Sequence, residues 1–373
     1  MDGNLYRVEG EENIDSPALI YYQDIIEENI KKAVAMAGDA DRLWPHVKTH
    51  KMEAMIRLQQ SYGIQRFKCA TIAEAEMTAR CGPVGNGAQH ILLSYPLVGP
   101  AIGRFIRLRG QYCSSIFYAI GDNLDQLSLL GEAALAAKQD DLPVLVDVNL
   151  GMDRTGVALE NLEAFCLDCG KIKGISLRGL HCYDGHFSIK DIAERERAVD
   201  KTTESLFKVK ETLEKRGQKL PIMVMGGTPT FPCHLREKGA YLSPGTFFVQ
   251  DWGYGSKYKD LDFTPGAALL TRVVSHPAKG LFTVDLGYKA IAADPAGQRG
   301  IIASLPQAEP IAQSEEHWVF RIAGEVPPIG AVLYVLPTHI CPTTALYPGA
   351  YVTMCGKLVN YWEVTARNRR ISV

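Results

Sequence analysis

Short apolar runs alternate with amphipathic helix patterns from residue 24 to residue 247 of this chain. The runs, which are typical of buried strands, cover residues 43–48, 67–71, 91–95, 115–119, 143–149, 175–183, 222–226 and 240–247. Between most of them apolar residues recur at helical spacing, as in 24–38 and 202–217, and both of these patterns end on a glycine. Strands that alternate with helices indicate parallel βα units. Eight such strands predict a (β/α)8 TIM-type barrel, with a doubly wound open sheet as the alternative.

The pattern changes after about residue 255, where alternating short runs follow one another with turn residues between them. These runs are AALLTRVVSH, GLFTVDLGYKAIA, HWVFRIAGE, AVLYVLPTH and AYVTMCGKLVNYWEV. They predict a mostly antiparallel β domain, to which NLYRVE near the N-terminus adds a strand. We therefore expect a barrel over residues 15–254 and a β domain formed by residues 1–14 and 255–373.

Composition excludes several classes of function. The formal net charge is −2 with no long basic run, which argues against a nucleic acid or an anionic membrane as partner. No apolar stretch approaches the roughly 18 residues of a transmembrane helix. The polar, acidic N-terminus lacks the features of a signal peptide, and the nine scattered cysteines fit reduced thiols. We expect a cytoplasmic enzyme that acts on a small molecule.

A lysine stands at the end of the first apolar run, in the stretch PHVKTHK. If residues 43–48 form the first barrel strand, Lys48 lies at its carboxyl end, the face on which barrel enzymes build their active sites. A lysine with apolar neighbours, His46 and His50 can have a lowered pKa and act as an amine nucleophile. The alternative is a surface lysine in a polar turn.

A glycine turn, GGTPTFP, directly follows the seventh run. Gly226, Gly227 and Thr228 could present backbone N–H groups to a phosphate, and a helix that begins after the turn would add to them. The loops after strands seven and eight are the usual phosphate site of barrels, although a plain turn is the alternative. A lysine at the first strand and a phosphate site at the seventh predict pyridoxal 5'-phosphate, bound to Lys48 as a Schiff base.

Two further stretches carry candidate side chains at strand ends. Arg154, in GMDRTG, could bind the phenolic oxygen of the cofactor or a substrate carboxylate, or be an exposed loop residue. LHCYDGH brings together His181, Tyr183 and His186, and either histidine could serve as a general acid or base. A buried histidine with satisfied hydrogen bonds is the alternative for each.

LPTHICPTT contains a histidine and a cysteine at i and i+2. In an extended segment the side chains of His339 and Cys341 point to the same side. Imidazole and thiolate are suitable ligands for a divalent metal, although this spacing also arises by chance. Two protein ligands would leave the remaining positions to water and substrate.

Taken in order, PHVKTHK, LHCYDGH, GGTPTFP, SPGTFF, DLGYKAIAADP and HICPT resemble the D-threonine aldolase family over nearly the whole chain. That family is similar to the metal-activated D-serine dehydratases and, more distantly, to alanine racemases. The resemblance implies an alanine racemase-like fold, in which a pyridoxal phosphate-binding barrel is joined to a β domain. It also implies a homodimer. One departure is Trp44, where the resemblance leads us to expect arginine.

The resemblance assigns roles to the candidate residues. Lys48 matches the Schiff-base lysine, Arg154 the arginine at the phenolic oxygen, and the Gly226–Thr228 turn the phosphate loop. His339 and Cys341 match the ligands of a divalent metal, which would be Mn, Zn or Mg.

The implied reaction is the cleavage of a D-β-hydroxy-α-amino acid to glycine and an aldehyde, with His181 or His186 as the base. Two alternatives remain. A dehydratase of D-serine or D-threo-3-hydroxyaspartate would give a 2-oxo acid and ammonia from the same site. An amino-acid racemase would need a second base, for which Tyr288 is a candidate.

Overall fold

The computed structural model describes residues 3–373, and the chain divides into two compact units. The barrel unit contains Val34–Lys48, Ile56–Gly245 and Asn368–Val373. The β unit contains the residues up to Ala33 together with Thr49–Met55 and Thr246–Arg367. Among the described residues, no helix has the length and apolar character needed to cross a membrane.

The barrel unit is built on a parallel sheet whose strands follow the order β2-β3-β4-β5-β7-β8-β9. Their bounds are Arg66–Cys69, Gln89–Leu93, Ser115–Gly121, Leu142–Asn149, Ile175–Cys182, Ile222–Met225 and Tyr241–Leu242, and a short β6 (Val157–Ala158) pairs with β5. Every neighbouring pair in this order is parallel. The predicted run of parallel βα units is therefore confirmed.

The segment that contains Leu43 and His46 closes this sheet into a barrel. Leu43 forms a parallel bridge with Leu242 of β9, and His46 forms one with Lys68 of β2. Residues 43–48 were predicted to be a regular strand, and this is wrong in detail. Only the two bridges form, and a 3₁₀ turn, η4 (Val47–Thr49), follows, because Pro45 has no N–H to donate to a ladder.

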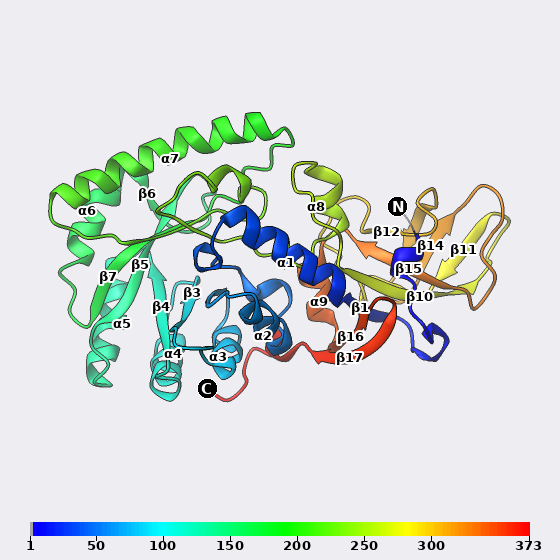
Figure 1. The fold of residues 1–373 in the computed structure, drawn as a ribbon, viewed down its shortest axis with the longest axis horizontal. Helices are drawn as coiled ribbons and strands as arrows, with labels where there is room; N and C mark the ends of the chain where they lie inside the picture. Colours follow the sequence, from blue (N-terminus) through cyan, green and yellow to red (C-terminus); the bar gives the residue numbers. More distant parts are fainter. Residues whose placement is uncertain (1–2) are drawn as a thin grey trace. The chain divides into compact units, whose positions relative to one another are not determined.

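Helices lie outside the strands of the barrel unit (Figure 1). They are α3 (Ile72–Cys81), α4 (Pro100–Gln111), α5 (Leu124–Ala136), α6 (Leu159–Cys169) and α7 (Ile192–Lys215), and the 3₁₀ turns η3 (Ala40–Arg42) and η5 (Pro232–His234) complete the unit. Side-chain caps start several of them: Thr71 accepts from the Glu74 N–H, and Asp191 accepts from the Glu194 N–H. The Asp191 cap explains why α7 begins ten residues before the predicted 202.

The two predicted helix ends are confirmed. α1 (Gln23–Ala37) stops before Gly38, which has a φ of +79°, and α7 stops before Gly217, which has a φ of +84°. Both glycines lie in the left-handed region that commonly ends a helix.

Trp44 lies in the barrel core. It is fully buried with Leu92, Tyr118, Ile120, Leu145 and Val224, and its indole N–H donates to the carbonyl of Phe67 at 2.9 Å. A buried tryptophan needs such a partner for its N–H. The arginine expected at this position is thus replaced by an apolar, hydrogen-bonded side chain.

The β unit contains a mostly antiparallel sheet with the strand order β13-β14-β11-β10-β1-β16-β17. The strands are β1 (Ala18–Tyr22), β10 (Ala267–Ser275), β11 (Leu281–Val284), β13 (Glu309–Gln313), β14 (Trp318–Arg321), β16 (Gly349–Met354) and β17 (Lys357–Glu363). Off this path, β15 (Val332–Pro337) pairs with β10 and with β12 (Gly300–Ile302). Short helices α8 (Trp252–Lys257) and α9 (Ile340–Leu346) also belong to this unit.

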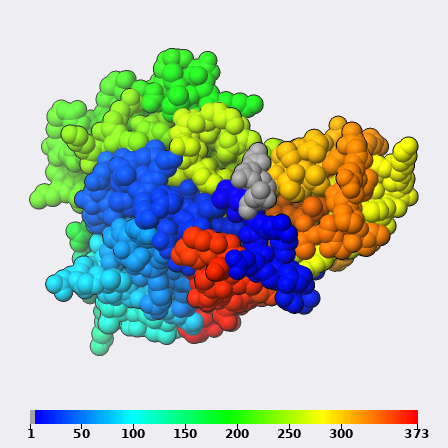
Figure 2. Space-filling model, turned by 45° about the vertical axis from the view of Figure 1, so that its right-hand side comes forward, coloured from blue at the N-terminus to red at the C-terminus, as the bar shows by residue number. Residues whose placement is uncertain are grey.

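The N-terminal part of the chain differs from the prediction. Residues Gly3–Tyr6 form a 3₁₀ turn instead of the strand expected for NLYRVE. The strand comes later, as β1, which pairs with β10 and β16 although it lies beyond the predicted boundary at residue 14. Its fully buried ALIYY sequence suits a central position in a sheet. The Glu9 N–H donates to Gly356 O, and Figure 2 shows the blue N-terminal residues beside the red C-terminal region.

Candidate active site

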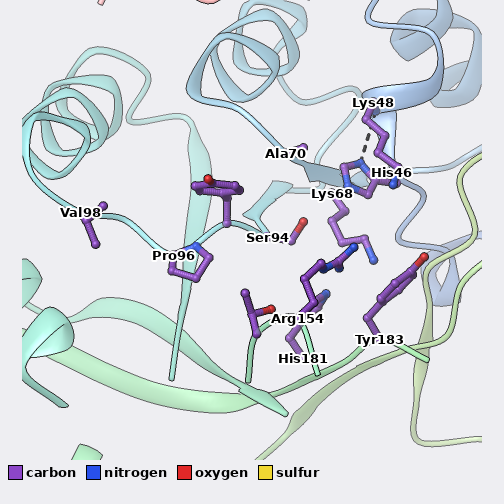
Figure 3. Close-up of a pocket in the computed structure, with 12 residues that line it drawn as sticks. His46, Lys48, Lys68, Ala70, Ser94, Pro96, Val98, Arg154, His181 and Tyr183 are labelled. Carbon is purple, nitrogen blue, oxygen red and sulfur yellow. Dashed lines mark hydrogen bonds between the residues drawn. The ribbon is translucent and has the colours of Figure 1, made fainter. Parts of the chain in front are cut away.

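A cavity of about 540 Å³ opens among the carboxyl ends of the barrel strands. This volume lies within the range of about 300–1,000 Å³ usual for small-molecule sites. Among the side chains that line it are three cations and two imidazoles, which are Lys48, Lys68, Arg154, His46 and His181 (Figure 3). Parallel strands bring their carboxyl ends to one face, so residues more than 100 positions apart meet there.

Lys48 lines this cavity from η4, directly after the segment that closes the barrel. Its side chain is half-buried, and its backbone N–H donates to Nδ1 of His46 at 3.3 Å (Figure 3). The 3₁₀ turn therefore presents the lysine at the barrel mouth.

A second lysine, Lys68, lies in the same cavity and was missed from the sequence. Its side chain is only 2% exposed, at the end of β2. Burial, and after it the charge of Lys48, lowers the pKa of Lys68 from 10.5 to about 7. The sequence contains one indication of Lys68, because it is the only charged residue in the apolar run FKCAT.

Arg154 and Lys68 both lie against the ring of Tyr183. The Arg154 guanidinium carbon is 5.1 Å from the ring centroid, and the Lys68 Nζ is 5.4 Å from it. Gly185 and Gly227 leave room for this ring: a Cβ on Gly227 would come within 2.9 Å of Tyr183 Cε2. Tyr183 is thus held between two glycines with two cations beside it.

His181 is a buried imidazole with a fixed orientation. Its Nδ1 is 2.7 Å from Oδ1 of Asp147, while its Nε2 has no hydrogen-bond partner among the described residues. Burial lowers the pKa of His181 and outweighs the attraction of Asp147. Burial alone would raise the pKa of Asp147, but hydrogen bonds from His181 and Thr155 lower it. A neutral imidazole that donates from Nδ1 has a free lone pair at Nε2, as a general base requires.

His186 does not line the cavity. Its ring packs against Phe187, with the ring centroids 4.2 Å apart, and it lies close to Gly151 in the loop after β5. Of the two predicted histidines, only His181 lies with Lys48 in the cavity. Asp147, the partner that orients His181, was not singled out from the sequence.

The glycine turn predicted to bind a phosphate makes several hydrogen bonds within the chain. The Gly226 N–H donates to Cys182 O, and the Gly227 N–H donates to Thr230 Oγ1, so two of its backbone donors are used within the chain. The three-residue 3₁₀ turn η5 follows, in place of the expected helix. Thr228 Oγ1 accepts from the Gly245 N–H. The turn lies beside Tyr183, which lines the cavity, because a Cβ added to Gly227 would come within 2.9 Å of that ring.

A buried network of hydrogen bonds stabilises this turn. Asp184 accepts hydrogen bonds from Thr230 Oγ1 and from Nε2 of His234, which is 2.7 Å away. All three side chains are buried. Because Thr230 also accepts from Gly227, the network links the turn to the end of β7.

The predicted metal ligands lie in the β unit. Cys341 belongs to α9 and His339 precedes the helix, so the segment is not extended as the spacing argument assumed. Cys341 nevertheless lies close enough to His339 to influence the pKa of its imidazole. His339 Nδ1 is 2.6 Å from Asp294 Oδ2, and Cys341 Sγ is 3.2 Å from Thr49 Oγ1.

This arrangement fits two ligands of a metal site. A metal-binding histidine usually donates its other ring N–H to a carboxylate, as His339 does to Asp294. Burial lowers the pKa of His339, but contacts with Cys341 and Asp294 raise it to about 9. Within residues 3–373 there is no group of three or more His, Cys, Asp or Glu side chains arranged to hold a metal.

Comparison with known proteins gives two family matches. Residues 23–250 match the alanine racemase N-terminal domain, and residues 266–353 match the putative serine dehydratase domain. A D-threonine aldolase from an Arthrobacter species is 28% identical over 95% of this chain and 93% of its own length. The D-threo-3-hydroxyaspartate dehydratase of Delftia sp. strain HT23 is 24% identical over 94% of this chain and 97% of its own.

Solved structures show the same fold. The D-threonine aldolase of Filomicrobium marinum has a TM-score of 0.87 at 24% identity, covering 95% of this chain and 96% of that one. An alanine racemase of Clostridium difficile 630 has a TM-score of 0.70 at 13% identity, covering 94% of this chain and 100% of that one. The alanine racemase-like fold predicted from the sequence is therefore confirmed.

Proposed function

We propose that this chain, which belongs to the family of the alanine racemase N-terminal domain, is a lyase dependent on pyridoxal phosphate and a divalent metal. It would cleave D-β-hydroxy-α-amino acids to glycine and an aldehyde. The observation that carries the proposal is the cavity that Lys48 shares with Arg154, Tyr183 and a neutral His181. The similarity to a D-threonine aldolase over 95% of the chain supports the same reaction.

The cavity residues suit pyridoxal phosphate. Lys48 would hold the cofactor covalently, Arg154 would bind an anionic oxygen and Tyr183 would contact the ring, while the Gly226–Thr228 turn remains the proposed phosphate site. When bound, the cofactor supplies an aldehyde that condenses with the substrate amine and a pyridine ring that accepts an electron pair from Cα. The lone pair of His181 Nε2, which has no partner within the described chain, suits proton transfer at this cavity.

In the proposed reaction His181 removes the proton of the β-hydroxyl, and the Cα–Cβ bond breaks. The β-carbon leaves as an aldehyde, and Cα takes up a proton to give glycine. We prefer His181 to His186 because only His181 lines the cavity. A divalent metal held by His339 and Cys341 would supply Lewis acidity toward the β-hydroxyl.

A dehydratase is the second candidate, and the similarity to D-threo-3-hydroxyaspartate dehydratase favours it. There the Cα proton leaves first and the hydroxyl is expelled, so that the products are a 2-oxo acid and ammonia. The same residues serve both reactions.

The proposed homodimer, which rests on the resemblance, is testable by light scattering.

Product analysis tests the proposal. Purified protein with pyridoxal phosphate and manganese or zinc is incubated separately with D-threonine and D-serine. Glycine and acetaldehyde, lost on chelation and in Lys48→Ala, would support the aldolase. A 2-oxo acid and ammonia would establish the dehydratase instead. Neither product, despite bound cofactor, would reject both and call for racemase assays.

Borohydride reduction followed by peptide mapping tests the lysine assignment. We expect the cofactor on Lys48. A cofactor attached to Lys68 would show that the assignment is wrong.

A further inference from the structure

Lys68 is a buried lysine that the proposed reaction does not use. It belongs to β2, where all four residues are buried, and its side chain is 2% exposed. It nevertheless lines the cavity, and Figure 3 shows its amine directed into the space beside Arg154 and Tyr183. An amine in this position is available to a molecule bound in the cavity.

The carboxylates that act on Lys68 are already engaged elsewhere. Asp147 accepts from His181 at 2.7 Å, and Asp184 accepts from His234 at 2.7 Å. Within the part of the chain that the structure describes, Lys68 forms no ion pair with either. A buried ammonium without a paired anion is costly, since burial removes its hydration.

The other neighbours of Lys68 add positive charge. Lys48 and Arg154 both act on it electrostatically, and His46 lines the same cavity. Arg154 and Lys68 lie 5.1 and 5.4 Å from the centroid of the Tyr183 ring. Two cations on one ring, with no anion among the described residues paired to Lys68, form a site that an anionic ligand would complete.

We propose that Lys68 and Arg154 together bind one anionic oxygen of the ligands in this cavity. The oxygen comes either from the phenolate of pyridoxal phosphate or from the carboxylate of the amino acid. This inference rests on the proposed function and assigns Lys68 a noncovalent role, distinct from that of Lys48. The lowered pKa of Lys68 agrees with it, because an amine that titrates near neutrality becomes charged when an anion binds beside it.

The first arm of the test examines the phenolate. The visible absorbance of the bound cofactor is titrated with pH in the wild-type holoenzyme, in Lys68→Met and in Lys68→Arg. A nearby cation disfavours protonation of the chromophore, so its removal should raise the midpoint by about one pH unit or more. Lys68→Arg keeps the charge and should restore the wild-type midpoint.

The second arm examines the carboxylate. D-alanine carries the amine and carboxylate of the substrate class and lacks the β-hydroxyl, so neither cleavage nor dehydration consumes it. Its dissociation constant is measured from the spectral change of the holoenzyme. An unchanged midpoint with binding weakened by about tenfold in Lys68→Met would identify the carboxylate as the ligand.

Two results obtained with a protein that binds the cofactor would overturn the inference. The first is a Lys68→Met holoenzyme with the wild-type midpoint and wild-type affinity for D-alanine. The second is covalent attachment of the cofactor to Lys68. A wild-type protein that takes up no pyridoxal phosphate would reject the proposed function itself, together with this inference, so the two failures are distinguishable. Lys68→Gln serves as a second neutral variant if Lys68→Met folds poorly.

Discussion

His181 Nδ1 lies 2.7 Å from Asp147 Oδ1, and both side chains are buried at the ends of adjacent strands, β7 and β5. The pair leaves Nε2 of His181 without a partner among the described residues. The register of the sheet places Asp147 opposite His181, so the contact follows directly from strand pairing.

If His181 is the base, His181→Gln should lower kcat by about 10²–10⁴. The cofactor absorbance should persist, because Lys48 is untouched. His186→Gln is the matched control, since His186 packs outside the cavity, and its kcat should stay close to that of the wild type. A large loss in His186→Gln with an active His181→Gln would reverse the assignment.

Asp147→Asn should cost about ten- to a hundredfold in kcat, because it removes a charged hydrogen bond worth about 1.5–3 kcal/mol. Asp147 raises the pKa of His181 against the effect of burial. Without that carboxylate the pKa of His181 falls further, so the acidic limb of the rate profile that reports His181 should move to lower pH. A pH profile of kcat/KM measures this shift, and a limb that moves to higher pH would contradict it.

Lys68 makes the stability of the cofactor-free protein depend on pH. The pKa of Lys68 is about 7 in the folded protein, against an ordinary value of 10.5. Between pH 7 and pH 10.5 the amine of Lys68 is therefore protonated in the unfolded chain and mostly neutral in the folded protein. The contribution of Lys68 to the free energy of unfolding is therefore lowest below pH 7 and rises as the pH increases toward 10.5. Lys68→Met should be more stable than the wild type at pH 7 by about 2–4 kcal/mol. The difference should shrink at pH 10, and urea unfolding at both values checks it.

Removal of the metal should abolish turnover and leave the cofactor in place. His339→Ala and Cys341→Ser should lose bound metal, as measured by elemental analysis, and should not regain activity when manganese or zinc is added back after chelation. Cys355→Ser is the control, because Cys355 is an exposed thiol in the same unit. Full activity of both ligand variants after chelation would exclude a metal at this pair.

Gly227→Ala should destabilise the protein by about 1–3 kcal/mol, because the added Cβ would come within 2.9 Å of Tyr183. The displaced Tyr183 should also weaken cofactor binding. Gly239→Ala is the matched control, since a Cβ there meets no atom of the described residues within 4 Å. Thermal unfolding and a cofactor titration of both variants test this, and equal behaviour would show that Tyr183 moves freely.

The parts of this site that could be predicted depend on local pattern. The alternation of apolar runs and helices predicts parallel strands, and parallel strands place Lys48, Arg154, His181 and Tyr183 at one face. The helix ends at Gly38 and Gly217 were equally readable, because a glycine in the left-handed region is a local requirement.

Other parts depend on pairings between distant residues. The role of Asp147 follows from the register of β5 against β7. The backbone N–H groups of Gly226 and Gly227 donate to Cys182 and Thr230, and the sequence of the turn does not reveal these partners. His181 and His186 are equivalent in the sequence, and only the path of the chain after β7 separates them.

The sequence by itself determined the fold class and the strand ends at which chemistry could occur, since periodicity and turn residues act over a few positions. Only the tertiary structure decided which side chains are buried and what they face. Lys68 is the plainest case. Its side chain is only 2% exposed, and the two cations that act on it, Lys48 and Arg154, come from other parts of the chain. Burial and charge are properties of the whole environment of a residue, and that environment exists only once the barrel has closed.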